Sequence, residues 1–215
     1  MPTPLRNDFR LWYARVAAAT AWFALLLQLW LSIELARTNG QGAWHGVWMY
    51  FAFFTILTNL LAAAALTAAA LRRSASILVS PGIVTGIAAN IVLVGIAYNL
   101  LLRNTWNPQG LQLLADVLLH DIDPPLFLGW WWLAASARPS RYAEILTWAC
   151  YPIAYFAYAM ARGAVDGFYP YPFVDVPELG IARVLANALA ILAGFIAVAA
   201  LLVALARFRA QRAHA

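Results

Sequence analysis

A threonine and a histidine, which can carry out acid–base chemistry together, each lie in an apolar stretch of the chain. Thr55 follows two phenylalanines in the stretch 47–71, and His120 lies in the stretch 111–136. A threonine hydroxyl is a poor nucleophile until a base removes its proton, and the base works better when a third group fixes its tautomer. A threonine with a histidine and an aspartate can perform acyl transfer to the hydroxyl, followed by hydrolysis of the acyl-enzyme. We therefore predict Thr55 as nucleophile and His120 as general base.

Aspartates surround His120, and prolines follow it. Asp116, His120 and Asp123 are spaced i, i+4 and i+7, so they share one face of a helix. Prolines 124 and 125 remove two amide donors, so we expect a kink beside this cluster, facing a cavity or the protein interior. By helical phase Asp116 is the best candidate to orient the imidazole, and Asp123 is the next. The alternative is a buried histidine that an aspartate holds in place for packing alone.

Polar residues also share one face of the stretch 47–71. Thr55, Thr58 and Asn59 lie at i, i+3 and i+4. We take Thr58 and Asn59 as candidate substrate-binding residues. The alternative is packing, because threonine hydroxyls bond back to the preceding turn and asparagines join helices in membranes.

A proline-rich aromatic loop follows the fifth apolar stretch. Arg162 ends that stretch, and the segment Tyr169–Phe173 reads YPYPF. Its prolines exclude a continuous helix, and its aromatic rings suit a membrane–water boundary. We predict that the segment folds back over the bundle as a lid, with Arg162, Tyr169 and Tyr171 as candidate substrate-binding residues. A helix-end ion pair of Arg162 with Asp166 and a simple boundary anchor are the alternatives.

Composition places these residues in a membrane. Of 215 residues, 64% are hydrophobic and 11% are charged, and the mean hydropathy is +0.73. A soluble domain is about 45–50% apolar and about 25% charged. This balance excludes an ordinary soluble enzyme, a disordered segment and a nucleic-acid binder. A single cysteine, Cys150, and three scattered histidines give no metal-binding pattern, so we expect no metal and no cofactor.

Six stretches are long and apolar enough to cross a bilayer, which takes about 20 residues. The predicted fold is therefore all-α, a six-transmembrane-helix bundle that forms one polytopic membrane domain over 1–215. The expected helices cover 14–36, 47–71, 78–102, 111–136, 142–163 and 181–206.

The distribution of arginine predicts the topology. All 14 basic residues are arginines; ten lie near the N-terminus, 72–73, 138–141 and the C-terminus, and four lie on the opposite side. The positive-inside rule then puts both termini in the cytoplasm, an N-in/C-in topology in a cell membrane, with a bacterial inner membrane as the expected location. In this arrangement Thr55 lies ~12 Å and His120 ~14 Å below the outer surface, so the two side chains can meet.

The motifs resemble a known family. The run Phe-Phe-Thr55, the spacing from His120 to Pro125 and the PFVD in YPYPFVDV look like the androgen-induced and androgen-dependent multipass membrane proteins. The bacterial pattern, with Thr58-Asn59 and Tyr-Pro-Tyr-Pro-Phe, looks like the Pr6Pr membrane-protein family. The resemblance implies hydrolysis of fatty acid esters of hydroxy fatty acids or similar acyl esters, with Thr55 and His120 at the positions of the catalytic threonine and histidine.

Two other classes of function stay open. Asp121 and Asp123 follow His120 where the animal proteins carry uncharged residues, which favours a small transporter or proton-coupled carrier. The absence of a convincing repeat of halves opposes it. A structural or partner-binding membrane protein is the third class. For every class the expected partners are membrane lipids, with an acyl-ester substrate for the hydrolase and no nucleic acid.

Overall fold

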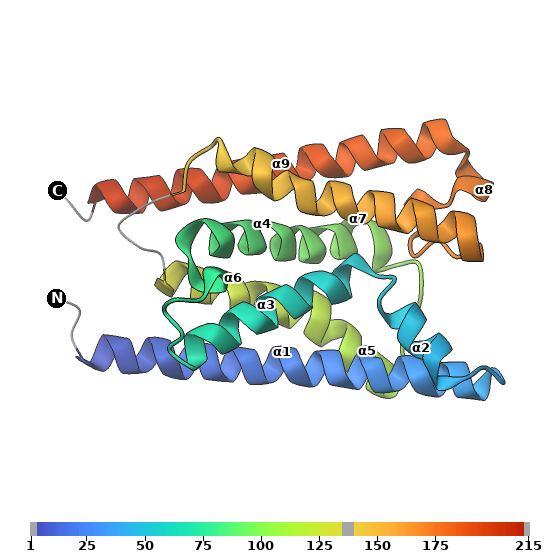
Figure 1. Ribbon diagram of the computed structural model, residues 1–215, viewed down its shortest axis with the longest axis horizontal. Coiled ribbons are helices and arrows are strands. Elements are labelled where there is room, and N and C mark those ends of the chain that lie inside the picture. Colours follow the sequence, from blue (N-terminus) through green and yellow to red (C-terminus); the bar gives the residue numbers. More distant parts are fainter. Residues whose placement is uncertain (1–3, 135–139, 213–215) are drawn as a thin grey trace.

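The computed structural model describes residues 4–134 and 140–212, and every regular element in these ranges is helical (Figure 1). Of the arginines that predict the topology, Arg138 and the side chain of Arg6 lie outside the described part. The longer helices are α1 (Pro4–Thr38), α3 (Phe54–Ala70), α4 (Pro81–Ala97), α6 (Asp123–Ala134), α7 (Glu144–Asp166) and α9 (Ile181–Arg212). Shorter elements are α2 (Ala43–Tyr50), α5 (Gly110–Val117), α8 (Val176–Leu179), the 3-10 turns η1 (Ile77–Val79) and η4 (Pro172–Val174), and the π-helical turns η2 (Tyr98–Leu102) and η3 (Leu118–Ile122).

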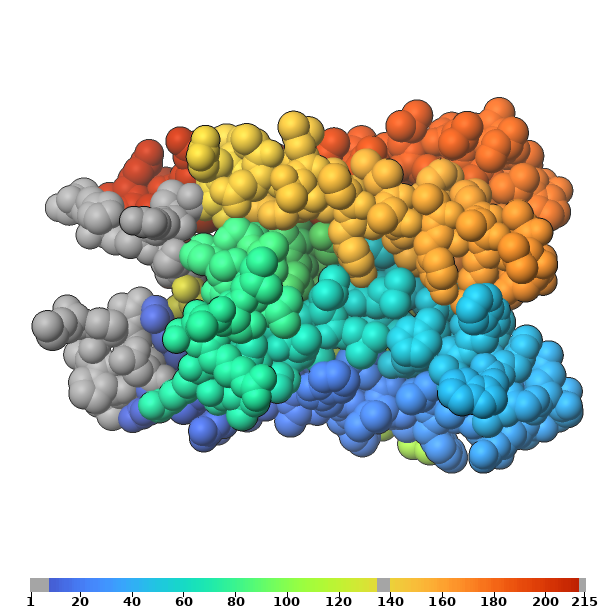
Figure 2. All heavy atoms as spheres, viewed as in Figure 1, coloured from blue at the N-terminus to red at the C-terminus, as the bar shows by residue number. Residues whose placement is uncertain are grey.

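Helix α4 forms the centre of the bundle. It contacts α3, α6, α7 and α9, while α1 packs against α2, α3, α5 and α6 on the other side. Figure 1 shows α1 and α9 on opposite sides, and the first turn of α1 lies at the same end as the last turn of α9. Figure 2 shows how side chains close the face between α1 and α7, with α2, α3 and the start of α4 between them.

Several helices have the dimensions of membrane spans. Three stretches are long and apolar enough by length and composition, Asp8–Thr38, Pro81–Leu102 and Ile181–Arg212, and the pair α2 and α3 makes a fourth if the bent pair is one span. Large apolar side chains also cover the outside of the molecule, including Leu26 on α1 and Leu189 on α9. An apolar exterior of this kind is stable in lipid, so the chain is a membrane protein.

The prediction of one straight helix over 47–71 is wrong. The segment divides into α2 and α3, which meet at an angle of 79°. Phe51–Phe53 leave the helix without any proline or glycine. Gly46 lets α2 lie against α1, because a Cβ there would come within 2.5 Å of the Ile33 Cα. The depth of Thr55 counted along a straight helix is therefore wrong too, since Thr55 is the second residue of α3.

The predicted helix over 111–136 is also interrupted, as its prolines indicate. It divides into α5, the π-helical turn η3 and α6. His120 lies inside the turn, and Pro124 and Pro125 lie in the first turn of α6, where a helix has no use for amide donors. The expected distortion beside His120 is confirmed, although a π-helical turn causes it just ahead of the prolines.

Candidate functional site

The structure brings Thr55 and His120 into contact. Thr55 Oγ1 lies 3.2 Å from His120 Nε2, although 65 residues separate them in the sequence. Thr55 is 8% exposed, and the His120 side chain is 13% exposed. The pair therefore joins the start of α3 to the turn η3 at a largely buried position.

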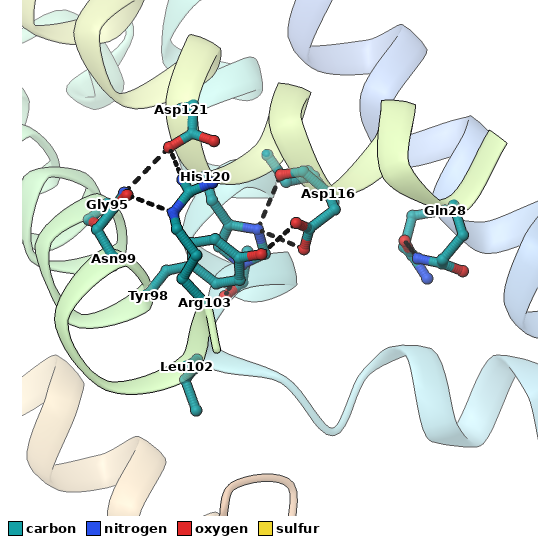
Figure 3. A network of polar contacts seen from close by, with 12 residues as sticks. Gln28, Gly95, Tyr98, Asn99, Leu102, Arg103, Asp116, His120 and Asp121 are labelled. Atoms are coloured by element: carbon teal, nitrogen blue, oxygen red, sulfur yellow. Dashed lines mark hydrogen bonds and ion pairs between the residues drawn. The ribbon is translucent and has the colours of Figure 1, made fainter. Parts of the chain in front are cut away.

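The surroundings of His120 determine its tautomer (Figure 3). Its Nδ1 lies 2.9 Å from the backbone oxygen of Asp116 and 3.2 Å from Oδ1 of the same residue. A backbone oxygen only accepts hydrogen bonds, so this contact fits the tautomer with the proton on Nδ1. In the neutral imidazole the lone pair of Nε2 then faces the Thr55 hydroxyl. This is the state that a general base requires.

Tyr98 belongs to the same cluster and was not predicted. Its hydroxyl donates a hydrogen bond to Asp116 Oδ2, and its ring stacks on His120 with centroids 3.9 Å apart and planes inclined by 16°. Tyr98 begins the π-helical turn η2, while His120 lies in η3. Inserted turns of this kind are frequent at functional sites. The only hint in the sequence is a tyrosine beside Asn99 in an otherwise apolar stretch.

Asp121 and Asp123 do not join the cluster. Asp121 lies on the other side of the turn, where it binds Arg103 Nη2 at 2.5 Å and Asn99 Nδ2 at 3.0 Å (Figure 3). Asp123 is 3% exposed, and neither of its carboxyl oxygens has a hydrogen-bond partner among the described residues. The predicted orienting role therefore has geometric support at Asp116 and none at Asp123.

Because Thr55 lies at the start of α3, backbone amide donors lie close to its hydroxyl. Phe53 is the N-cap in an extended conformation, so the amides of the first turn have no acceptor within the helix. The Thr55 amide points toward Tyr171 Oη at 3.4 Å. The first turn of a helix also carries partial positive charge. A developing negative charge beside the Thr55 hydroxyl would thus meet backbone donors.

One face of α7 stabilises the bend between α2 and α3. Arg162 Nη1 donates to the Trp48 oxygen at 2.6 Å, and hydroxyls donate to the oxygens of Phe51 at 3.2 Å and Ala52 at 2.9 Å. These carbonyls belong to the end of α2 and to the break. The side chains that take part are spaced i, i+4, i+7 and i+11 and are Tyr151, Tyr155, Tyr158 and Arg162. We call this set the α7 ladder.

The predicted ion pair of Arg162 is part of this ladder. Arg162 Nε lies 3.3 Å from Asp166 Oδ2, and its guanidinium carbon lies 4.1 Å from the centroid of the Trp48 ring. The Trp48 indole donates to the same Asp166 oxygen at 2.8 Å. Partial burial acts to raise the pKa of Asp166, but the Phe168 amide, the indole and Arg162 outweigh it and hold that pKa below its ordinary value.

Of the five predicted substrate-binding residues, one lies beside Thr55 and four hold other parts of the fold together. Tyr171 is 9% exposed and lies beside Thr55. Thr58 contacts Tyr151 Oη at 3.2 Å, and Asn59 donates to the Thr55 oxygen at 2.9 Å and to the Leu119 oxygen at 3.3 Å. These two residues therefore join helices, as the packing alternative states. Arg162 holds α2, and the ring of Tyr169 packs where a Cβ of Gly163 would otherwise lie.

Two cavities meet at Thr55. One has a volume of about 250 Å³ and extends between α4, α7 and α9; the other, of about 210 Å³, contains His120 and Asp116. Thr55, Tyr98, Leu102 and Tyr171 line both. The loop 169–173 folds back over the bundle as predicted, with the rings of Tyr171 and Phe173 stacked 5.1 Å apart.

The described residues contain no group of three histidine, cysteine or acidic side chains that could hold a metal ion. The chain matches no protein-family model, no curated protein and no solved structure. The functional conclusion therefore depends on the residues and the geometry of this chain.

Proposed function

We propose that this chain is an intramembrane ester hydrolase with Thr55 as nucleophile and His120 as general base. The observation that carries the proposal is the contact of His120 Nε2 with the Thr55 hydroxyl at 3.2 Å. The backbone oxygen of Asp116 contacts the opposite nitrogen at 2.9 Å and its carboxylate lies 3.2 Å away, so in our proposal Asp116 acts as the positioning residue. A hydroxyl, a base and an orienting group in this order are the parts of an acyl-transfer site.

The reaction follows from this arrangement. Thr55 Oγ1 attacks the ester carbonyl carbon while its proton moves to His120 Nε2. The tetrahedral intermediate collapses, the C–O bond to the alcohol breaks, and His120 returns the proton to the leaving oxygen. Water then attacks the acyl-threonine with His120 again taking the proton, and the fatty acid leaves as Thr55 Oγ1 recovers its hydrogen.

The start of α3 supplies the stabilisation of the intermediate. The carbonyl oxygen becomes negative during the attack, and in our proposal it replaces Tyr171 Oη as the acceptor of the Thr55 amide hydrogen bond. Preorganised donors of this kind contribute about 10²–10³-fold to the rate when one is removed.

The same proposal includes the membrane topology and the family. We propose six crossings, in which the bent pair α2–α3, the interrupted helix α5–η3–α6 and α7 each count as one; three or four of the six have the length and composition of a membrane span. We propose that both termini are cytoplasmic, and that the chain is related to the Pr6Pr and androgen-induced proteins on the strength of its short motifs. Reporter fusions after residues 40 and 215 should report opposite sides of the membrane; the same side would refute this topology.

A serine-hydrolase probe tests the activity. A fluorophosphonate should form a bond from its phosphorus to Thr55 Oγ1 with loss of fluoride, and mass spectrometry should find the adduct on Thr55. The reconstituted protein should release fatty acid from acyl esters, including esters of hydroxy fatty acids. Thr55→Ala should lose both signals and Thr67→Ala, a matched variant on α3, should keep them. Equal labelling of the two variants would contradict the proposal.

A proton-coupled carrier is the second candidate, and Asp123 is the observation that favours it. A carboxyl group that is 3% exposed and has no partner among the described residues is expensive inside a membrane unless it has a function. Proton flux into vesicles that Asp123→Asn abolishes and Thr55→Ala leaves intact would support the carrier over the hydrolase.

A further inference from the structure

The larger cavity is an apolar chamber that ends at Thr55. Its volume is about 250 Å³, and its walls come from α4, α7 and α9. Apart from Thr55 and the three tyrosines that border it, its lining is apolar and includes Leu93, Ala97, Phe156, Ala188 and Leu192. Such a chamber favours a hydrocarbon chain and offers nothing to a charged or hydroxylated ligand.

The chamber opens at the lipid-facing surface between α7 and α9. Three of its lining residues are also exposed on the outside: Ile153 is 51% exposed, Leu185 47% and Leu189 67%. Leu185 and Leu189 belong to α9, which has the length and composition of a membrane span. A chain can therefore pass from the bilayer into the chamber without crossing water.

The second cavity differs in chemistry although it shares Thr55 with the first. Its volume is about 210 Å³, and its lining mixes apolar side chains, such as Ile56 and Leu119, with polar ones, which besides His120 and Asp116 include Gln28, Ser32 and Gln112. Gln112 Nε2 donates to Gln28 Oε1 at 2.9 Å. The remaining donor and acceptor atoms of these two side-chain amides can bind hydroxyl groups of a ligand. Unlike the first cavity, this one can therefore bind an alcohol through its polar groups.

We infer that the chamber between α4, α7 and α9 is an acyl-chain site that is filled laterally from the bilayer, and that the second cavity receives the polar alcohol of the same ester. The substrate class is then an ester of one long fatty acid with an alcohol that carries further polar groups. The assignment of the two ester halves rests on the proposed function, whereas the binding of a chain in the chamber does not.

Photolabelling tests the chain site without any need for activity. The full chain is reconstituted in phosphatidylcholine vesicles with palmitate that carries a diazirine at the end of its chain. Label should appear on α7 and α9 residues that line the chamber, such as Phe156 and Leu192, and excess palmitate should suppress it. Ala188→Phe fills the chamber and should lower this labelling about tenfold. Ala190→Phe, an exposed residue of the same helix outside the chamber, should not.

A result with equal labelling in Ala188→Phe and Ala190→Phe, or with label spread evenly over the lipid-facing surface, would overturn the chain site. Specific labelling of a protein that hydrolyses no ester would keep the chain site and refute the proposed hydrolase. The two proposals therefore fail separately.

Ester hydrolysis tests the assignment of the two halves. Monoacylglycerols of increasing acyl length are compared in the wild type and the two variants. Ala188→Phe should lose turnover of long acyl chains about tenfold and keep turnover of the shortest one, so that the preference shifts toward short chains. An equal loss at all lengths, with wild-type hydrolysis intact, would overturn the assignment.

Discussion

Thr55 and His120 each belong to an interrupted helix, and the two interruptions are stabilised differently. The bend between α2 and α3 turns the chain by 79° and leaves carbonyls that only another helix, α7, can satisfy. In the helix α5–η3–α6 the chain continues through a π-helical turn, in which the Asp123 amide bonds to the Leu118 oxygen. Both interruptions use distant residues: α7 side chains donate to the carbonyls of the first, whereas in the second a single side chain, Asn59 of α3, donates to the Leu119 oxygen.

This difference shows two ways in which a polar side chain can be placed inside an apolar bundle. The π-helical turn presents His120 within a nearly continuous helix, and Asn59 bonds the Leu119 oxygen of that turn. The sharp bend presents Thr55 at a helix start, where its amide donates to Tyr171 Oη, and it needs the α7 ladder. We therefore expect the α3 side of the pair to be sensitive to substitutions on α7, and the η3 side to be sensitive to Asn59 and Tyr98, which contact it.

The largest effect should come from the two contacting residues. Thr55→Ala and His120→Ala should each reduce kcat for ester hydrolysis by about 10⁴-fold or more, and the double variant should lose little beyond either, because members of one catalytic unit are not additive. Steady-state kinetics on reconstituted protein measure this. Losses that multiply in the double variant would show that the residues act independently.

Asp116→Asn should cost less, about 10²-fold in kcat. The backbone oxygen of Asp116 lies 2.9 Å from Nδ1 and still holds the tautomer when the carboxylate is lost. Rate profiles against pH should shift for Asp116→Asn while the folded fraction stays constant. A loss as large as that of His120→Ala would mean that the carboxylate alone orients the ring.

The α7 ladder should determine the stability of the bend. Arg162→Met should lower the free energy of unfolding by about 2 kcal/mol and Tyr155→Phe by about 1 kcal/mol, because buried carbonyls lose their donors. Unfolding in detergent measures both. Tyr142→Phe, a half-exposed tyrosine outside the ladder, is the control and should change nothing. Equal losses in the control would remove the special role of α7.

Gly95 tests how closely the turn η3 must lie against α4. A Cβ at Gly95 would lie 3.2 Å from the His120 oxygen and 3.4 Å from Pro124 Cβ. Gly95→Ala should push η3 away from α4 by a few tenths of an ångström and lower kcat less than tenfold. Gly194→Ala, on α9 with nothing within 4 Å, is the matched control and should keep full activity.

The smallest effect should come from Asp166. Its pKa is lowered from 3.8 in the folded protein, so its ionised form stabilises the fold. This contribution is complete above the ordinary value and is lost as pH falls through the lowered pKa. The melting temperature between pH 5 and pH 2.5 should fall more steeply in the wild type than in Asp166→Asn. Parallel curves would show that Asp166 does not hold the C-terminal end of α7.

The sequence indicated some of these features better than others. Prolines 124 and 125 predicted the distortion beside His120, because proline has no amide donor in any context. The bend at Phe51–Phe53 contains neither proline nor glycine, and it exists because side chains of another helix satisfy its carbonyls. A pattern read along one segment cannot contain a tertiary contact of that kind.

The same reasoning applies to the site. Thr55, His120 and Asp116 are conspicuous because polar groups are rare in apolar stretches. Tyr98 and the tyrosines of α7 were overlooked because tyrosine is also common at membrane boundaries. The spacing of Tyr151, Tyr155, Tyr158 and Arg162 on one helical face was the available signal.

The opening between α7 and α9 also changes how the protein would sense its substrate. A ligand that enters through exposed Ile153 and Leu189 arrives by diffusion in two dimensions. The relevant concentration is then its mole fraction among the surrounding lipids, and the Michaelis constant has the units of surface density. Adding inert phospholipid to the vesicles would slow turnover at a fixed amount of substrate, as dilution does for a soluble enzyme.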